Sequence, residues 1–436
     1  MSAEVKSDDA LLDEVQRETF QYFLHEANDR NGLVADCTRP GWPCSIAATG
    51  LGLASYPVGV ERGWMSRENA LARTLAALEF FSASEQSTSA GATGYRGFYY
   101  HFLDMDTGRR TWESEVSTVD STFLVAGALL SAQYFGGDDA GERRVRELAD
   151  ALYRRMDWQW ARNGAASVTH GWKAESGFLP YRWLGYCEAL LLYVLALGSP
   201  THRLPPDAYD AWLAPYDWRD LYGQPQVYAG PLFIHQLSHA WIDFRGIADR
   251  YMRAKGIDYF ENSRRATLVH AQYAIDNPKR FGYYNAYCWG ITAGDGPGPA
   301  EFEIDGIARK FLGYAARGAP FGPDDGTFSP WVVVASLPFA PEVVMPTIRH
   351  MIDRMQLKQG DRYGFEASFN PLFPGGSDKA HGWRSEWNYG INQGPIVLMI
   401  ENHRSGLPWR LMRGCRYVTD GLRRAGFAGG WLGGDR

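Results

Sequence analysis

Acidic side chains in apolar or aromatic surroundings are the first candidates for chemistry in this sequence. Glu188 lies in the segment RWLGYCEALLLYVLALGSPTH, where we expect it one turn into a very apolar helix, behind Trp183 and Tyr186. Burial disfavours the charged form of a carboxyl group and raises its pKa. Glu188 would then stay protonated near neutral pH and could act as a general acid. The alternative is a buried ion pair with an arginine.

A second acidic cluster occupies the segment GFYYHFLDMDTGRRTWESEVSTVD, which contains His101, Glu115 and Asp120. Glu115 and Asp120 are five residues apart across a predicted helix start, so both side chains can face one end of the fold. Glycoside hydrolysis needs two carboxyl groups, one protonated and one ionised. We therefore take Glu115 and Asp120 as catalytic candidates beside Glu188. The alternative for Glu115 is a local interaction with a helix dipole.

A third candidate region is the loop YGFEASFNPLFPGGSDKAHGWRSEWNYGINQGP, in which Glu366 is a further candidate catalytic acid. The chain has 16 Trp, 24 Tyr and 22 Phe. Aromatic side chains have an apolar face that suits a pyranose ring, although a large core also uses them. The candidate substrate-binding residues are Tyr99, His101, Trp183, Tyr186, His235, His239, Arg245, Trp289, Trp387, Asn392 and Gln393.

No metal site and no cofactor are predicted. His235 and His239 are four residues apart in PLFIHQLSHAWIDFR and would share a helix face, but the glutamate of an HExxH zinc motif is missing. Hydrogen-bonding roles are therefore favoured for both histidines. The segment GDGPGP lacks the spacing and the lysine of a phosphate-binding loop, and no G-x-S-x-G motif occurs.

The composition excludes several classes of partner. The net charge of -6 is spread along the chain, which supports neither nucleic-acid binding nor a basic membrane patch. No apolar run is long enough to span a bilayer. The first residues are acidic and polar, so we expect the chain as given to be cytoplasmic, or periplasmic if a signal has been removed. Of the five cysteines, only Cys37 and Cys44 lie close in sequence, and free thiols are favoured over a disulfide.

Hydrophobic periodicity predicts about a dozen helices along the chain. Helical hairpins joined by long loops favour an all-α fold, an (α/α)6 barrel or toroid, as one domain over residues 1–436. A stacked solenoid is the competing layout, but no repeat of fixed period is visible. The predicted helices cover residues 9–26, 45–56, 66–84, 118–134, 141–158, 183–197, 231–246, 261–276, 301–316, 341–355, 389–402 and 407–424.

Long ordered matches identify a family resemblance. The strings SIAATGLGLASYPVGVERGW, GFYYHFLD with ESEVSTVD, YCEALLLYVLALGSPTH, GPLFIHQLSHAWIDFRG, WGITAGDGP, DGTFSPWVVVASLPFAPE and GPIVLMIENHRSG resemble the glucoamylase-like domain of glycoside hydrolase family 144. They extend from about residue 9 to residue 412. The resemblance implies an (α/α)6 barrel that acts on β-1,2-glucan without a metal, by inversion. A related domain of cyclic β-1,2-glucan synthases retains configuration and transfers chains.

The resemblance also implies residue roles. Glu188 falls on the glutamate of the family's Y-x-E-A motif, which we assign as the general acid, and Glu115 and Asp120 fall on the acids of its E-x-S-x-x-D motif. Two positions depart from the pattern. Ala367 replaces the acid of the family loop G-F-x-D-A-F-N, and Asn392 replaces the acid of G-I-D-Q-G-P.

Three functional hypotheses follow. In the first, a glycosidase uses Glu188 to protonate the leaving oxygen, while Glu366, Glu115 or Asp120 activates water. In the second, a sugar hydroxyl replaces water and the protein is a transglycosylase. In the third, the changes at the two acid positions leave a glycan-binding domain without activity. A polysaccharide lyase is disfavoured by the acidic net charge. Exo or endo cleavage and the oligomeric state stay open.

Overall fold

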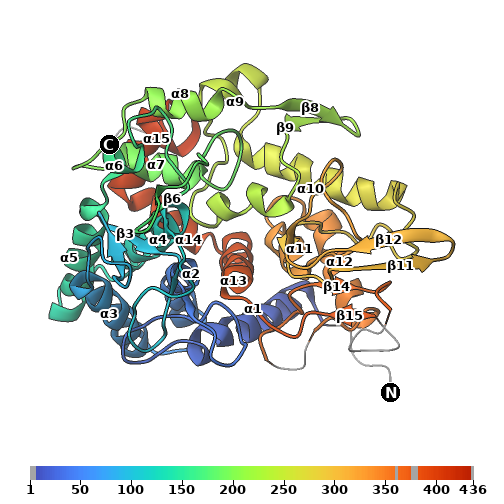
Figure 1. Cartoon of the computed structure of the whole chain (residues 1–436), viewed down its shortest axis with the longest axis horizontal. Coiled ribbons are helices and arrows are strands. Elements are labelled where there is room, and N and C mark those ends of the chain that lie inside the picture. The colour runs from blue at the N-terminus through green and yellow to red at the C-terminus, as the bar shows by residue number, and fades with distance from the viewer. Residues whose placement is uncertain (1–5, 359–361, 375–381, 434–436) are drawn as a thin grey trace.

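The computed structural model describes residues 6–358, 362–374 and 382–433, and it shows helices arranged around a ring (Figure 1). The expected all-α toroid is confirmed. The inner ring consists of α2 (Ile46–Glu61), α4 (Thr118–Tyr134), α7 (Leu190–Gly198), the 3-10 turns η1 (Leu232–His235) and η2 (Leu237–Ala240), α11 (Pro330–Ala335) and α13 (Gly390–Arg404). The outer helices are α1 (Asp8–His25), α3 (Arg67–Ala83), α5 (Ala140–Arg155), α8 (Asp207–Leu213), α10 (Tyr259–Asp276) and α12 (Pro341–Asp353).

The inner ring closes on itself through packing and hydrogen bonds. Helix α2 packs against α4 and α13, α4 packs against α7, and α11 packs against α13. The η turns complete the circle, because Ser238 Oγ accepts from the backbone N–H of Leu191 at 3.1 Å and Gln236 Nε2 donates to the carbonyl of Val332 at 2.6 Å. The first and last inner helices, α2 and α13, thus meet, and the outer helix α1 packs against α13 as well (Figure 1).

Burial explains why the two rings differ in sequence. Helix α2 is buried along nearly its whole length and is apolar on every side, as expected for a helix enclosed by others. Helix α5 on the outside buries Val145, Leu148, Ala149 and Leu152, which recur at the spacing of one helix face. The inner helices α2 and α4 touch backbone to backbone, since a Cβ on Gly127 would lie 2.0 Å from the carbonyl oxygen of Gly50.

The last two helices cover one end of the inner ring. Helix α14 (Leu407–Gly414) contacts α2, α4 and α13, and α15 (Arg416–Arg424) packs against α7. A single helix was expected over residues 407–424, but it breaks at Cys415, whose ψ of 109° is extended. The remaining helices are short: α6 (Trp158–Ala161), α9 (Arg250–Lys255) and η3 (Gly430–Leu432).

Three other sequence predictions are corrected. Helix α7 begins at Leu190 rather than at residue 183, and residues 231–246 form two 3-10 turns instead of one helix. Residues 301–316 contain a β-hairpin, not a helix. Its two-residue loop, Asp305 and Gly306, has positive φ at both positions, which is the geometry of Asp-Gly hairpin turns. The short inner helix α11 was not predicted because it is little more than one turn long.

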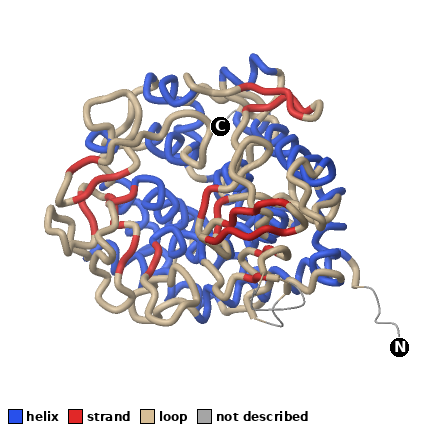
Figure 2. The backbone as a smooth tube through the Cα atoms, turned by 45° about the vertical axis from the view of Figure 1, so that its right-hand side comes forward, coloured by secondary structure: helices blue, strands red, loops and turns tan. Residues whose placement is uncertain are grey.

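The strands are short segments in the loops between helices, as Figure 2 shows. The largest sheet is antiparallel, with strand order β2-β3-β5-β6-β7. Its strands are β2 (Gly94–Tyr95), β3 (Phe98–Tyr100), β5 (Val116–Ser117), β6 (Gly171–Lys173) and β7 (Gly177–Phe178). The two-stranded pairs are β1 (Cys44–Ser45) with β4 (Phe102–Leu103), β8 (Trp218–Leu221) with β9 (Gln224–Val227), β10 (Ala293–Gly294) with β13 (Ala315–Ala316), β11 (Ala300–Ile304) with β12 (Ile307–Phe311), and β14 (Phe369–Asn370) with β15 (Trp383–Arg384).

Two further expectations concern cysteines and membranes. All five cysteines are free thiols, as predicted, and Cys37 and Cys44 are both buried. Among the helices in the described part of the chain, none combines the length and the apolar character needed to cross a membrane.

Candidate active site

A cavity of about 680 Å³ opens at the end of the ring where inner helices begin. Ser45 and Ser117, which cap the amino termini of α2 and α4, both line it, and so does Tyr389 at the start of α13. Glu188 lines it from the turn just before α7. Helix amino termini carry partial positive charge, so this end of the ring favours anionic groups.

Carboxyl groups from distant segments meet in this cavity. Those among its described lining residues are Asp36, Glu115, Asp120, Glu188 and Asp295. Carboxylates this close to one another cannot all ionise without cost, so some of them must hold protons or be paired with a cation. The cavity therefore provides both protonated and ionised acids, which glycoside hydrolysis requires.

Glu188 has the properties of the protonated member. Burial and, to a smaller extent, the nearby charge of Asp120 raise its pKa to about 7, against the opposing effect of its own backbone N–H. Glu188 is half-buried and its pKa is raised, as expected for an acid in apolar surroundings, but it lies before the helix and not one turn inside it. A site in the turn before α7 leaves its carboxyl group in the cavity instead of among the helices of the ring.

His101 joins the two acids of the second cluster. Its Nδ1 lies 3.1 Å from Glu115 Oε1 and its Nε2 lies 3.6 Å from Asp120 Oδ2. Burial lowers the pKa of His101, but the charges of Asp120, Glu115 and Asp36 outweigh it and raise that pKa to about 9. His101 is therefore an imidazolium at neutral pH. Its ring stacks on Phe102, with centroids 4.0 Å apart, which fixes its orientation.

The imidazolium keeps Glu115 ionised and also lies beside Asp120. Burial alone would raise the pKa of Glu115, but the hydrogen bond and the charge of His101 lower it overall. Asp120 Oδ2 also accepts from Ser117 Oγ at 2.5 Å. The ligand atoms of His101, Glu115 and Asp120 lie within 4.8 Å of one another, a spacing that a cation can also occupy. A metal would have to displace the proton of His101, because a ligating histidine is neutral.

Asp36 is a cavity residue that sequence reasoning missed. Burial raises its pKa to about 6, against the opposing effects of His101 and of a hydrogen bond from Trp42 Nε1 at 3.2 Å. The sequence signal was an acid inside the apolar run LVADC, ahead of the Trp42 loop. Asp295, in the segment GDGPGP, is another acid of this cavity that sequence reasoning missed. Its Oδ2 accepts from Ser385 Oγ at 2.9 Å.

Aromatic side chains line the rest of the cavity. Trp183, a predicted sugar-binding residue, stacks on His170 with ring centroids 3.7 Å apart, and its Nε1 donates to Thr118 Oγ1 at 2.9 Å. This contact fixes the indole plane in the wall of the cavity. The other aromatic lining residues are Trp42, Phe102, Trp112, Phe123, Phe233, Tyr314 and Tyr389. The lining thus combines apolar ring faces with the carboxyl groups described above.

Several predicted sugar-binding residues are instead part of the protein interior. Tyr99 is fully buried and donates to the carbonyl of Phe81 at 3.1 Å. Trp289 is buried and donates from Nε1 to Thr347 Oγ1 at 3.0 Å. Tyr186 packs against Tyr259, with centroids 5.7 Å apart. None of the three is among the residues that line the cavity. Their aromatic character serves core packing, which was the alternative explanation of the composition.

His235, His239 and Arg245 also lie away from the cavity. His235 Nε2 is 3.3 Å from the carbonyl of Ala229, and His239 Nε2 is 3.0 Å from Ser263 Oγ. Burial lowers the pKa of His235 to about 4 and that of His239 to about 3, so both are neutral hydrogen-bonding groups. Arg245 forms a two-pronged ion pair with Asp243 at 2.8 Å. Their expected contact with substrate is corrected accordingly.

The third candidate region, the long loop that contains Glu366, contributes Tyr389 and Ile391 to the cavity, and neither was among the predicted site residues. Glu366 is buried and lies 3.5 Å from Arg384, outside the cavity lining, so its position does not fit water activation. Trp387, Asn392 and Gln393 are not lining residues either, whereas Tyr389 and Ile391 are. Gln393 donates to Asn388 Oδ1 at 3.1 Å. Residues 375–381 of this loop lie outside the described part of the chain.

The chain is similar to a glucoamylase family and to solved structures of glucoamylase-like proteins. The family model Glycoamylase, described as "putative glucoamylase", matches residues 180–416. A crystal structure from Bacteroides uniformis with the same description is 30% identical, with a TM-score of 0.85 over 98% of this chain and 99% of that one. An endo-β-1,2-glucanase from Chitinophaga pinensis, solved with sophorotriose and glucose, is 28% identical, with a TM-score of 0.82 over 97% of this chain and 99% of the other.

A curated relative is named for an exo-acting enzyme. It is the exo-β-1,2-glucooligosaccharide sophorohydrolase (non-reducing end) of Parabacteroides distasonis, which is 25% identical over 96% of this chain. The chain spans only 58% of that relative's length.

Proposed function

Because the chain belongs to the Glycoamylase family, we propose that it hydrolyses β-1,2-linked glucans or their oligosaccharides, with Glu188 as the general acid. The membership agrees with the resemblance to glycoside hydrolase family 144. The substrate class is supported by relatives named as β-1,2-glucan hydrolases. The observation that carries the proposal is one cavity that holds a protonated glutamate, ionised acids and aromatic ring faces.

Glu188 protonates the glycosidic oxygen as the bond to the anomeric carbon breaks. With a pKa of about 7, roughly half of the Glu188 side chains hold a proton at neutral pH. The charge of Asp120 nearby raises this pKa and also stabilises the positive charge that develops on the sugar ring. The ionised acids therefore assist departure of the leaving group without donating a proton themselves.

Asp36 is the base that fits the second role best. His101 lies beside both Glu115 and Asp120, and it lowers the pKa of Glu115, which makes that carboxylate a weak base. Asp36 has a pKa of about 6 and a proton affinity suited to accepting a proton from water near neutral pH. Attack by that water on the face opposite the leaving group inverts the anomeric carbon. This assignment replaces Glu366, Glu115 and Asp120 as candidate bases.

The experiment incubates the wild type and the Glu188→Gln variant with linear β-1,2-glucan. Products are followed by chromatography and their anomeric form by NMR. New oligosaccharides with inverted configuration, formed by the wild type alone, support the proposal. Retained configuration or transfer products would replace it with a transglycosylase. An intact glucan that nevertheless binds would indicate a binding domain without activity.

A further inference from the structure

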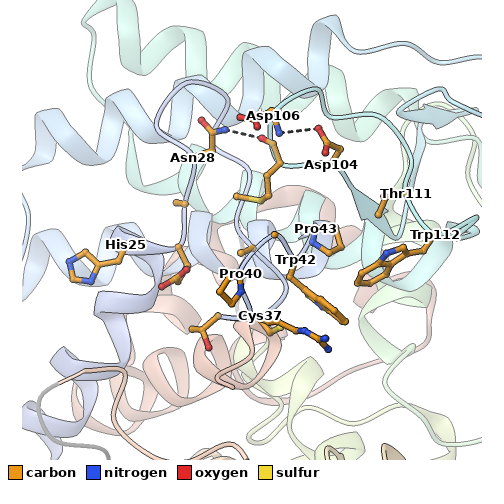
Figure 3. Close-up of a pocket in the computed structure, with 17 residues that line it drawn as sticks. His25, Asn28, Cys37, Pro40, Trp42, Pro43, Asp104, Asp106, Thr111 and Trp112 are labelled. Carbon is orange, nitrogen blue, oxygen red and sulfur yellow. Dashed lines mark hydrogen bonds between the residues drawn. The ribbon is translucent and has the colours of Figure 1, made fainter. Parts of the chain in front are cut away.

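A second cavity, of about 480 Å³, adjoins the active-site cavity. It lies between the end of α1, the loop of residues 35–43 and the loop of residues 104–112 (Figure 3). Trp42 and Trp112 line both cavities, so the two meet at this pair of indoles. Figure 3 shows the two tryptophans beside each other at one end of the second cavity, with His25 at the other end.

The backbone holds Trp112 outward at an energetic cost. The backbone N–H of Ser114 donates to the carbonyl of Thr111 at 3.1 Å, which closes a turn whose central residues are Trp112 and Glu113. Both have positive φ, 56° and 51°, in a position where Asn-Gly is usual. Side chains in this region cost about 1–2 kcal/mol per residue. Such strain is found preferentially at ligand-binding sites, and Trp112 is 52% exposed.

The neighbours of Trp112 give it a fixed orientation. The rings of Trp42 and Trp112 meet edge to face with centroids 4.6 Å apart, and Trp112 lies 5.1 Å from Phe102. The guanidinium of Arg39 lies over the Trp42 ring at 4.6 Å. Trp42 is also tied to the proposed base through its hydrogen bond to Asp36. The two indoles therefore form a rigid aromatic surface that leads out of the active-site cavity.

The rest of the second cavity presents hydrogen-bonding groups. The polar side chains that line it include those of Glu26, Thr38, Arg39, Asp104 and Thr111. Among the described residues of this lining, acids outnumber the one arginine, so a phosphate or another anion is not favoured. A neutral polyhydroxylated ligand with apolar ring faces satisfies both parts of the lining, and the volume is within the range of ligand-binding pockets.

We propose that the second cavity binds further glucose units of the same glucan chain whose scissile bond lies in the active-site cavity. The chain passes over Trp42 and Trp112 from one cavity into the other. This inference rests on the proposed function and adds to it a preference for long substrates. A substrate too short to reach the second cavity gains nothing from it.

Two variants test the inference at residues that line the second cavity and not the active-site cavity, although Arg39 lies over Trp42, which lines both. Thr111→Trp fills the second cavity, and Arg39→Ala removes a lining group without adding bulk. Arg144→Ala, on the exposed face of α5, is the matched control. For each protein, kcat/KM is measured with long linear β-1,2-glucan and with nitrophenyl β-sophoroside, and the ratio of the two values is compared. Thermal unfolding checks that each variant is folded.

The expected result is a fall of roughly tenfold in the long-to-short ratio for Thr111→Trp and a smaller fall for Arg39→Ala, with no change for the control. Calorimetry in the Glu188→Gln background should show the same loss of affinity for the long glucan. If the wild type cleaves both substrates and both variants keep its ratio and its affinity, the second cavity is not a glucan site. If the wild type cleaves neither, the proposed function itself has failed.

Discussion

The protonation states of Glu188 and Asp36 predict a bell-shaped dependence of kcat/KM on pH. Activity needs Glu188 protonated, with a pKa of about 7, and Asp36 ionised, with a pKa of about 6. The fraction of enzyme in this state is greatest near pH 6.5, where it is roughly 0.6. It falls to roughly 0.09 at pH 5 because Asp36 is protonated, and to roughly 0.03 at pH 8.5 because Glu188 is ionised.

The Glu188→Gln variant separates the two limbs of this profile. Loss of the general acid should lower kcat by roughly 10³-fold on glucan and remove the alkaline limb, since glutamine does not titrate. Nitrophenyl β-sophoroside has a leaving group that needs little protonation, so the loss on this substrate should be much smaller. The Asp36→Asn variant should instead remove the acidic limb and lose activity on both substrates, because the water still needs a base.

The assay is initial rates over pH 4.5–9 with both substrates, with reducing-end detection for the glucan and absorbance for the nitrophenyl product. The reasoning would be refuted if Glu188→Gln kept an alkaline limb, or if its loss were equal on the two substrates. Equal losses would mean that Glu188 holds the protein or the substrate in place and does not donate the proton. An Asp36→Asn variant with an intact acidic limb would return the role of base to another acid of the cavity.

The remaining predictions concern binding, packing and acid stability. Trp183→Ala should raise KM for glucan roughly tenfold with a smaller change in kcat, and unchanged steady-state kinetics would contradict its place in the sugar-binding wall. Gly127→Ala should lower the free energy of unfolding by about 2 kcal/mol or more in urea titrations, because the new methyl would meet the α2 backbone, while Gly136→Ala, whose methyl would lie 3.9 Å from the carbonyl oxygen of Gln133 without a clash, serves as control. Burial lowers the pKa values of His235, His239 and His270 to about 4, 3 and 3, so the folded protein keeps them neutral. Because the unfolded chain protonates them below about pH 6.5, the free energy of unfolding should fall as the pH drops below that value. At pH 5 each of these histidines should lower the free energy of unfolding by about 2 kcal/mol relative to pH 7. A urea midpoint that does not move between pH 7 and pH 5 would disprove this.

The helical architecture was accessible from the sequence because its signals are local. Helix α4 was predicted with the bounds that it has, residues 118–134, since Ser117 caps it and an apolar run follows. The helix predicted at 301–316 failed because the turn pair Asp305 and Gly306 outweighs a short apolar pattern. Residues 231–246 read as one helix, but they break into 3-10 turns where Gln236 bonds to α11.

Part of the candidate active site could also be predicted from the sequence. Glu188, Glu115, Asp120, His101 and Trp183 were all singled out and all line one cavity. An ionisable group in apolar sequence is costly unless it has a role, and that cost is visible without a structure. Histidines and aromatics gave no such signal, because the same residue types serve buried packing, as His239 and Trp289 do.

The sequence by itself determined the ring of helices and the acidic residues nearest the helix starts, because capping, periodicity and the burial of a charge are properties of short segments. Only the tertiary structure decided which acids share a cavity, since Asp36 and Asp295 are 259 positions apart and meet where inner helices begin. It also decided that Glu366 pairs with Arg384 away from that cavity. The protonation of each group depends on these neighbours, because charge and burial act through space and not along the chain.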